Sequence, residues 1–443
     1  MPDDIQSRDP RTNFADAYSE GIEAGDRRLW GRIAHSDRRG FLRGAGLSAM
    51  GLAIGASIPF HRSMPAGLIP AAFAQIPEMD AFGQYDGLTL LNERPLNAET
   101  PPHLLDDAIT PNDRMFIRSN GLIPDNQSDD VVENWRLIID GEVDNPLELS
   151  IADLQNDFDV HTVALHVECG GNGRAFFNPG ASGNQWTFGA VGCPEWTGVR
   201  LRDVLERAGV RDSAVYTGHY GNDPHISGDT ERDAISRGVP IEKAMDPTVM
   251  IVWAMNGGDM PQPNGHPLRL VVPGWPGSCS QKFLTRIQVR DQVHDGEKMG
   301  GYSYRMPAYP VAPGTEVPES DMEIMEAMPV KSIITFPETG TETAAGEATE
   351  IRGHAWVGDA EVSALDVSID FGQSWQAAEL DDPVNPGAWQ NWRTTVTLPE
   401  AGYYEVWARA TDSNGRMQPP VIPGWNPRGY GNNMSHRIAI FAA

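Results

Sequence analysis

Cysteine and basic residues are both scarce in this sequence, and each shortage excludes a class of protein. Three cysteines occur in 443 residues. Three thiols cannot form a disulfide framework, and by themselves they cannot fill a four-cysteine zinc or iron–sulfur site. The chain has 34 Lys and Arg against 61 Asp and Glu, giving a formal net charge of -27. Because nucleic acids and anionic membranes are bound through basic surfaces, this charge argues against both as partners.

Long apolar runs are also scarce, and the one candidate stands near the amino terminus. Residues 36–43 read Ser-Asp-Arg-Arg-Gly-Phe-Leu-Arg, the signature of twin-arginine (Tat) export, and residues 44–60 are apolar and uncharged. Ala72-Phe73-Ala74 then fits the small-x-small cleavage pattern. A short buried helix after a basic turn is the alternative. The order of the three features favours a Tat signal region over residues 1–74 and a periplasmic mature chain without a membrane span.

Residues 75–325 have the pattern of a mixed α+β domain. Strand-like runs, for example 135–139 and 269–272, alternate with few helices between Gly- and Pro-rich loops. The spacing of the apolar residues in 201–208 predicts a short amphipathic helix. Residues 75–113 are expected to form an irregular lead-in, and the Pro- and Glu-rich stretch 311–330 is expected to form a linker.

Residues 326–443 have a different, all-β pattern. Strands are predicted at 361–371, 392–398 and 403–410, and turn residues recur between them. Short strands with frequent turns, over about 110 residues, are typical of an immunoglobulin-like β-sandwich. The fold class predicted is therefore α+β followed by an all-β sandwich.

The most unusual segment is the loop that follows the apolar run 163–167. It reads Cys-Gly-Gly-Asn-Gly-Arg over residues 169–174. Glycines allow backbone N–H groups to approach an anion, and a thiolate beside such a loop and Arg174 is a good ligand for a soft metal. A buried cysteine at a tight turn is the plainer reading, and it is the one we give to Cys193 and Cys279.

This loop resembles the Cys-x-Gly-Asn-x-Arg loop of the sulfite oxidase family, the molybdenum–molybdopterin oxidoreductases. The resemblance extends, in the family's order, through 116–118, 186, 189–191, 196–201, 255–257, 265–269 and 272–274, and then through 371–375 and 425–429. It implies a molybdopterin-binding catalytic domain over 75–325 and an immunoglobulin-like dimerisation domain over 326–443. Within the family, residues 173–180 look closest to the branch that oxidises sulfane sulfur in periplasmic sulfur oxidation.

The resemblance also implies roles for particular residues. Cys169 matches the single protein ligand of molybdenum, and Tyr304 matches the active-site tyrosine, with Tyr302 as the alternative register. The matches to the pocket around the substrate anion are Arg118, Arg174, Trp186 and Arg428. The matches to the cofactor cradle are Asn120, His166, Asn264, Arg269, Ser278, Ser280 and Lys282. Asn120 and Asn264 depart from the animal sulfite oxidases, which have His at these positions.

The activity implied is oxidation of a sulfur substrate by oxygen-atom transfer, followed by transfer of electrons to an acceptor. The sequence contains no Cys-x-x-Cys-His haem motif. We therefore expect a c-type cytochrome subunit as the acceptor, and a sulfur-carrier protein with a cysteine-bound sulfane as the substrate. The net charge of -27 fits a basic partner, but it equally fits solubility in a salty medium.

Three other functions stay open at this stage. A dehydrogenase of free sulfite would share every metal-site residue. A molybdenum reductase of protein methionine sulfoxide is disfavoured by the sandwich domain at 326–443. An exported binding or adhesion protein would hold no molybdenum, so metal content distinguishes it from the enzymes.

Overall fold

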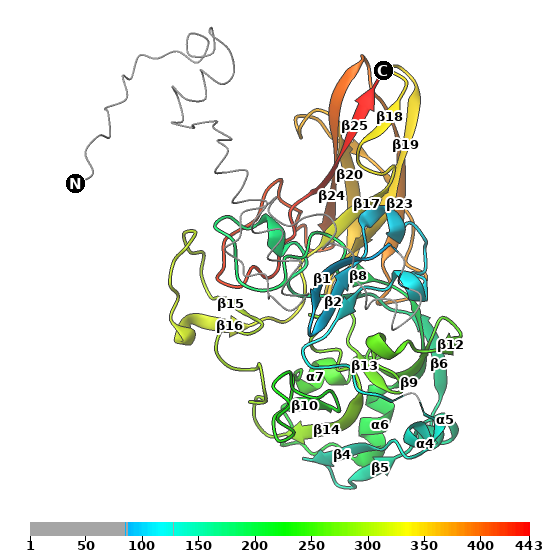
Figure 1. Ribbon diagram of the computed structural model, residues 1–443, viewed down its shortest axis with the longest axis vertical. Coiled ribbons are helices and arrows are strands. Elements are labelled where there is room, and N and C mark those ends of the chain that lie inside the picture. The colour runs from blue at the N-terminus through cyan, green and yellow to red at the C-terminus, as the bar shows by residue number, and fades with distance from the viewer. Residues whose placement is uncertain (1–84, 86, 127) are drawn as a thin grey trace, which may run out of the picture. The chain divides into compact units, whose positions relative to one another are not determined.

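The structure is a computed structural model that describes residues 85, 87–126 and 128–443 (Figure 1). The described residues belong to one compact unit. The predicted Tat signal over 1–74 lies outside them. None of the helices in the described part of the chain is long and apolar enough to cross a membrane.

The catalytic region is built on two sheets that pack over one core. One sheet has the order β10-β14-β4-β5, in which only β4 and β14 are parallel. The other has the order β12-β11-β9-β6, with β13 added to β11, and is antiparallel throughout. The strands are β4 (Leu137–Gly141), β5 (Leu147–Leu149), β6 (Val160–Ala164), β9 (Glu195–Arg200), β10 (Tyr216–Gly221), β11 (Met250–Met255), β12 (Gly258–Asp259), β13 (Arg269–Val271) and β14 (Leu284–Arg290).

The helices of this region are short and lie against the two sheets (Figure 1). They are α4 (Asp129–Glu133), α5 (Ile151–Asp157), α6 (Leu201–Ala208) and α7 (Ile241–Ala244). Helix α6 confirms the predicted amphipathic helix, because its four apolar residues at helical spacing are all buried. It ends at Gly209, whose φ of 72° is a left-handed conformation that favours glycine. Helix α5 begins with a capping box between Ser150 and Asp153.

The carboxy-terminal region is the predicted β-sandwich. One sheet has the order β17-β19-β23-β22, and the other has the order β18-β25-β24-β20-β21. Inward-facing residues such as Ile351, Trp392 and Ile440 fill the space between them. The strands are β17 (Lys331–Phe336), β18 (Thr341–Thr343), β19 (Ala348–Trp356), β20 (Val362–Ser368), β21 (Gln376–Ala377), β22 (Glu379–Leu380), β23 (Gln390–Thr397), β24 (Gly402–Asp412) and β25 (His436–Ala442).

Two segments are more ordered than their composition indicated. The expected irregular lead-in contributes β1 (Thr89–Glu93) and β2 (Leu96–Glu99), which form a small sheet with β3 (Ile117–Arg118). The expected linker contains β16 (Met322–Ile324), which pairs with β15 (Arg305–Pro307). Buried methionines at 322, 325 and 328 anchor that segment. The compositional prediction was wrong here because apolar contacts made far along the chain outweigh the local Pro and Glu content.

The remaining elements are short. They are the two-stranded pair β7 (Val167–Glu168) and β8 (Val191–Gly192), and the 3-10 turns η3 (Pro102–Leu105), η4 (Asn112–Arg114), η5 (Arg174–Phe176), η6 (Gln262–Asn264) and η7 (Glu319–Asp321). The apolar run 163–167 is divided between β6 and β7, which belong to different sheets. This break turns the chain out of the large sheet immediately before Cys169.

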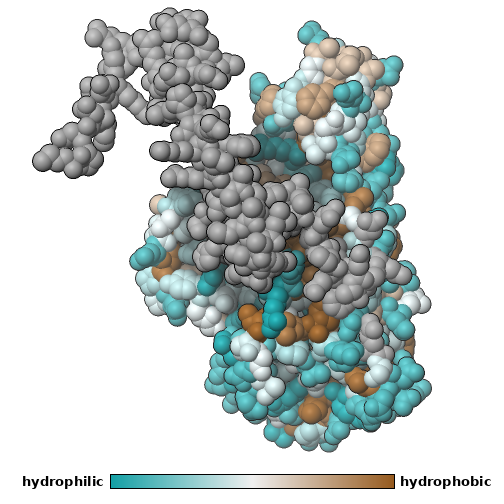
Figure 2. All heavy atoms as spheres, in the orientation of Figure 1, coloured by the Kyte–Doolittle hydropathy of each residue, from teal (hydrophilic) through white to brown (hydrophobic). Residues whose placement is uncertain are grey.

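The sandwich and the catalytic region share a buried boundary. His354 stacks on Trp389 with 3.9 Å between ring centroids, and its Nε2 donates to the carbonyl of Leu105 over 2.6 Å. Arg352 forms an ion pair with Asp106 nearby. Elsewhere hydrophilic residues dominate the face seen in Figure 2, with apolar residues in small groups.

Acidification should weaken this boundary through His354. Burial lowers the pKa of His354 to about 4, although its hydrogen bond to Leu105 opposes the shift. The unfolded chain therefore binds a proton that the folded chain excludes between pH 6.5 and about 4, so stability falls as the pH falls through that window. Each pH unit costs about 1.4 kcal/mol for one such histidine.

The test is the unfolding free energy of the wild type and of His354→Gln between pH 4.5 and 6.5. We expect the variant to be less stable at pH 6.5 and to lose stability less steeply on acidification, by about 1.4 kcal/mol per pH unit. Equal slopes would mean that His354 takes up its proton in the folded protein.

Candidate functional site

The Cys169 loop is a tight turn held by its own backbone. The Cys169 N–H donates to Ala190 over 2.9 Å, and the Cys169 carbonyl accepts from the N–H of Asn172 over 2.8 Å. Gly173 has a φ of 89°, and a Cβ there would lie 2.6 Å from the side chain of Asn432. Glycine is therefore required at this position. The turn presents the Cys169 side chain at the end of β7, where it lines a cavity.

This cavity gathers most of the predicted site residues. They come from five separated segments: the end of β3, the Cys169 loop, η6 with β13, the loop before β14, and the loop before β15. The predicted residues that line it are Arg118, Asn120, Cys169, Asn264, Arg269, Ser278, Ser280, Lys282 and Tyr304. Tyr304 lines the cavity, whereas the hydroxyl of Tyr302 donates to the carbonyl of Val317. This placement favours Tyr304 as the active-site tyrosine.

Positive charge exceeds negative charge among the residues that line the cavity. Arg118, Arg269 and Lys282 line it, and Asp223 is the one carboxylate among its described lining residues. Burial lowers the pKa of Arg269 to about 9. Burial, and then the nearby Arg269, lower the pKa of Lys282 to about 7. Burial raises the pKa of Asp223 to about 6, against the opposing effect of Lys282. Because each charge is costly to bury, the cavity is suited to an anionic occupant.

Asn120 connects Arg118, Lys298 and Tyr304 through one side-chain oxygen. Its Oδ1 accepts from Arg118 Nη2 over 2.8 Å, from Lys298 Nζ over 3.0 Å and from the Tyr304 hydroxyl over 3.5 Å. Arg118 Nη2 also donates to the Tyr304 hydroxyl over 3.4 Å. A guanidinium, an ammonium and a phenol thus converge on one amide oxygen, which fixes their directions relative to each other.

Four predicted residues are not among those that line the cavity. Arg174 is buried, and it donates to the carbonyls of Arg428 and Asn184 over 2.6 and 2.9 Å. It therefore joins the Cys169 loop to the sandwich. The Arg428 side chain donates to Ser182 over 2.9 Å. Arg174 Nε and Nη1 and Arg428 Nη1 thus bond to protein groups, and the place of both arginines around the anion pocket stays a prediction.

Trp186 and His166 are also placed differently. Trp186 is fully buried and packs edge-on against Phe116, with 6.4 Å between ring centroids. Phe116, not Trp186, lines the cavity. His166 lines a separate groove between the catalytic region and the sandwich, and its Nδ1 bonds to the carbonyl of Gly387. Successive side chains of an extended chain point in alternating directions. His166 and Cys169 are three residues apart, so their side chains point to opposite sides of the chain.

A stack of four side chains closes one side of the site. The guanidinium of Arg174 lies 5.1 Å from the ring centre of Tyr430, Tyr430 stacks on Tyr304 with 5.4 Å between ring centres, and the guanidinium of Arg237 lies 4.9 Å from the ring centre of Tyr304. Tyr304 has a φ of 50°, which is a strained conformation for a tyrosine. The stack holds the ring in place despite this strain.

Several site residues were missed from the sequence: Asp223, Lys298, Arg237, Gln281 and Tyr430. Asp223 and Gln281 line the cavity, and the other three contact Asn120 or Tyr304. Gln281 lies between Ser280 and Lys282, which were both predicted. Its position beside them was the one feature of the sequence that could have indicated it. The others come from loops whose sequences give no sign that they meet here.

Comparison with known proteins agrees with this geometry. Two family descriptions match the chain: "Oxidoreductase molybdopterin binding domain" over 121–298 and "Mo-co oxidoreductase dimerisation domain" over 322–443. Sulfite oxidase of Gallus gallus is 32% identical over 375 residues, which cover 80% of this chain and 78% of that protein. The chain belongs to the sulfite oxidase family.

Other members of the family extend the comparison. Mitochondrial sulfite oxidase of Rattus norvegicus is 32% identical over 81% of this chain, and the match spans 66% of that protein. The sulfane dehydrogenase SoxCD from Paracoccus pantotrophus has a similar fold, with a TM-score of 0.65 and 25% identity over 87% of this chain and 95% of that one. The chain therefore has the molybdopterin-binding domain and the dimerisation domain of the sulfite oxidase family. Its cofactor is the family's molybdenum–molybdopterin group.

The residues of the cavity fit that cofactor. Ser278 Oγ and Gln281 Oε1 are buried without a hydrogen-bond partner in the described protein, and both residues line the cavity. A pterin has many polar edges, and its phosphate is an anion, so these atoms and the cations Arg269 and Lys282 match it. Cys169 offers the one thiol of the lining. The described residues contain no cluster of three His, Cys, Asp or Glu that could bind a metal ion without such a group.

Replacing Cys169 tests this assignment. Cys169→Ser keeps the size of the side chain but replaces a soft thiolate by a hard, neutral hydroxyl. We expect protein from a host that makes the cofactor to keep its thermal stability to within a few °C and to lose turnover by at least about 100-fold. Cys193→Ser is the matched control, since Cys193 is buried away from the cavity. Full turnover by Cys169→Ser would show that this thiol is not needed for activity and would contradict its assignment to the site.

Proposed function

We propose that this protein oxidises sulfane sulfur bound to the cysteine of a carrier protein, by oxygen-atom transfer, and passes the electrons to a c-type cytochrome subunit. The observation that carries the proposal is the cavity that places Cys169 and Arg118 together, in a fold similar to sulfane dehydrogenase SoxCD over 95% of that chain. The oxidised sulfur product would be an anion, and the cavity carries an excess of positive charge to receive it.

The bound molybdenum–pterin group would supply the oxygen-atom transfer and the change of two electrons. The protein's part is to hold and orient the substrate and to exclude water from the site. Arg118 is half-buried, and its Nη2 donates to Asn120, so it can hold anionic oxygens of substrate and product in a fixed direction. The Tyr304 hydroxyl lies beside it and can donate to a substrate oxygen. The stacked ring of Tyr430 covers Tyr304 and keeps bulk water from that side.

Free sulfite is the second candidate substrate. The curated relatives named above are sulfite oxidases, at 32% identity. Sulfite is itself an anion, and Arg118 could bind it without any carrier protein. The two candidates share the described cavity, and they differ in what must reach it: a small ion in one case and a cysteine-bound arm in the other.

The partners and location follow from the same proposal. We propose export to the periplasm through the twin-arginine signal and a homodimer formed through the carboxy-terminal domain, which matches a dimerisation domain. The net charge of -27 supports a cytochrome with a basic surface, because complementary charge steers association.

A turnover assay with two substrates separates the candidates. Molybdenum-loaded protein is mixed with its cognate cytochrome and given either free sulfite or a carrier protein loaded with cysteine-bound sulfane. We expect cytochrome reduction with the loaded carrier at a kcat/KM at least about 100-fold above that with free sulfite, since a difference of about 3 kcal/mol in transition-state binding gives that ratio.

The unloaded carrier and the Cys169→Ser protein are the controls, and neither should reduce the cytochrome. Fast reduction by free sulfite with none from the loaded carrier would contradict the proposal and make the protein a sulfite dehydrogenase.

A further inference from the structure

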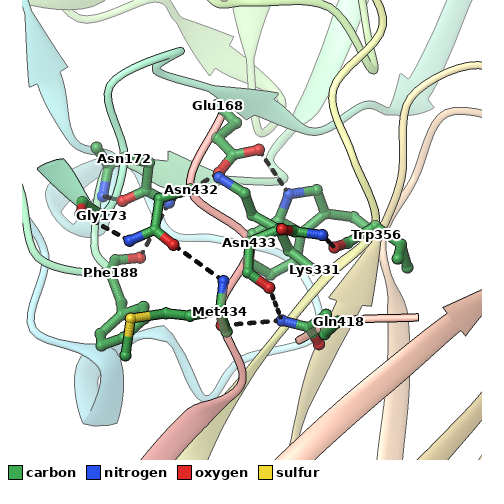
Figure 3. Close-up of polar contacts among 12 residues, drawn as sticks. Glu168, Asn172, Gly173, Phe188, Lys331, Trp356, Gln418, Asn432, Asn433 and Met434 are labelled. Carbon is green, nitrogen blue, oxygen red and sulfur yellow. Dashed lines mark hydrogen bonds and ion pairs between the residues drawn. The ribbon is translucent and has the colours of Figure 1, made fainter. Parts of the chain in front are cut away.

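A buried carboxylate stands directly before the metal ligand in the chain. Glu168 ends β7, one residue before Cys169, and is 1% exposed. Its side chain does not line the cavity. It points instead toward the sandwich, where Figure 3 shows it facing Lys331 and Trp356. No role in binding or catalysis has been given to it above.

Three donors converge on the two oxygens of Glu168. Lys331 Nζ lies 2.5 Å from Oε1 and Asn172 Nδ2 lies 2.9 Å from the same atom. Trp356 Nε1 donates to Oε2 over 2.9 Å. Both oxygens of the carboxylate therefore accept hydrogen bonds in this arrangement. A glutamine of the same shape would turn an N–H₂ group toward one of the donors.

Two of the donors belong to the sandwich and are aligned with each other. Lys331 begins β17 and Trp356 ends β19, and the two residues are directly paired across these antiparallel strands. Directly opposed residues of a strand pair project to the same face of the sheet. The register of β17 and β19 therefore brings both side chains to Glu168.

The third donor belongs to the Cys169 loop itself. Asn172 donates to Glu168, and its Oδ1 accepts from the N–H of Ala190 over 3.2 Å. The sandwich also holds the other side of the loop, where Asn432 Nδ2 donates to the carbonyl of Gly173 over 2.8 Å (Figure 3). The loop that carries the thiol is thus held between two parts of the sandwich.

We propose that Glu168 is a positioning residue for the molybdenum ligand: its carboxylate ties the Cys169 loop to Lys331 and Trp356, so that the sandwich fixes the direction of the thiolate. A buried ion pair is by itself weak evidence for stability, because apolar packing often serves as well. Directional hydrogen bonds to the residues around a ligand, in contrast, set its orientation and strength. The inference rests on the family's cofactor and not on the proposed substrate.

Glu168→Gln is the direct test, because it keeps the shape and mismatches the donors. The protein is produced in a host that makes the cofactor and is then reduced chemically, without substrate, to the Mo(V) state. We expect molybdenum affinity to fall about 10- to 100-fold, and the Mo(V) electron paramagnetic resonance spectrum of the remaining loaded protein to change. Trp356→Phe removes one neutral donor and keeps an aromatic ring at the position, so it should fold and should shift the same spectrum in a milder way.

Arg352→Met is the matched control, since it breaks another ion pair between the sandwich and the catalytic region. We expect it to lower thermal stability and to leave the molybdenum content and the Mo(V) spectrum as in the wild type. If Glu168→Gln and Trp356→Phe behave like Arg352→Met, with a changed melting temperature and unchanged metal content and spectrum, the positioning role is wrong. Because no sulfur substrate is used, this result is independent of the proposed function.

Discussion

Burying several positive charges around one thiol is the constraint on which the site depends. Arg269 is buried and Arg118 and Lys282 are half-buried, and the described lining offers them one carboxylate, Asp223. Removing a charge from water costs several kcal/mol unless a partner offsets it. Backbone carbonyls and Asn120 offset part of this cost. The phosphate of the molybdopterin cofactor is an anion, and it would offset part of the remainder.

The sandwich is part of this site as well as a dimerisation domain. Its strands β17 and β19 deliver Lys331 and Trp356 to the carboxylate beside Cys169. Its segment after residue 425 contributes Tyr430 to the stack on Tyr304. A catalytic domain without the sandwich would therefore lose one wall of the site and the outer support of its ligand loop. The two family domains accordingly form one compact unit in this chain.

Much of the fold was predictable because local pattern and buried faces agree. The apolar spacing in 201–208 gave α6, and the alternation in 403–410 lies within β24. The lining residues of the cavity, among them Arg118, Lys282 and Tyr304, were found through short motifs matched to a family.

Directions of side chains were not predictable in the same way. Arg174 and Arg428 carry the expected residue type, yet their guanidinium groups bond to Asn184 and Ser182, which only the folded loops reveal. Contacts such as Lys298 with Asn120 join loops about 180 residues apart, and a single sequence gives no sign of them.

The central claim is that one cavity, built around Cys169, holds the molybdenum cofactor of this protein. Crystals of the loaded wild-type protein, measured on both sides of the molybdenum absorption edge, test it most directly. The account predicts one molybdenum peak per chain in the anomalous difference map, bonded to Cys169 Sγ, with the pterin phosphate near Arg269 and Lys282. A molybdenum peak elsewhere, or a cavity without cofactor in fully loaded and active protein, would contradict it.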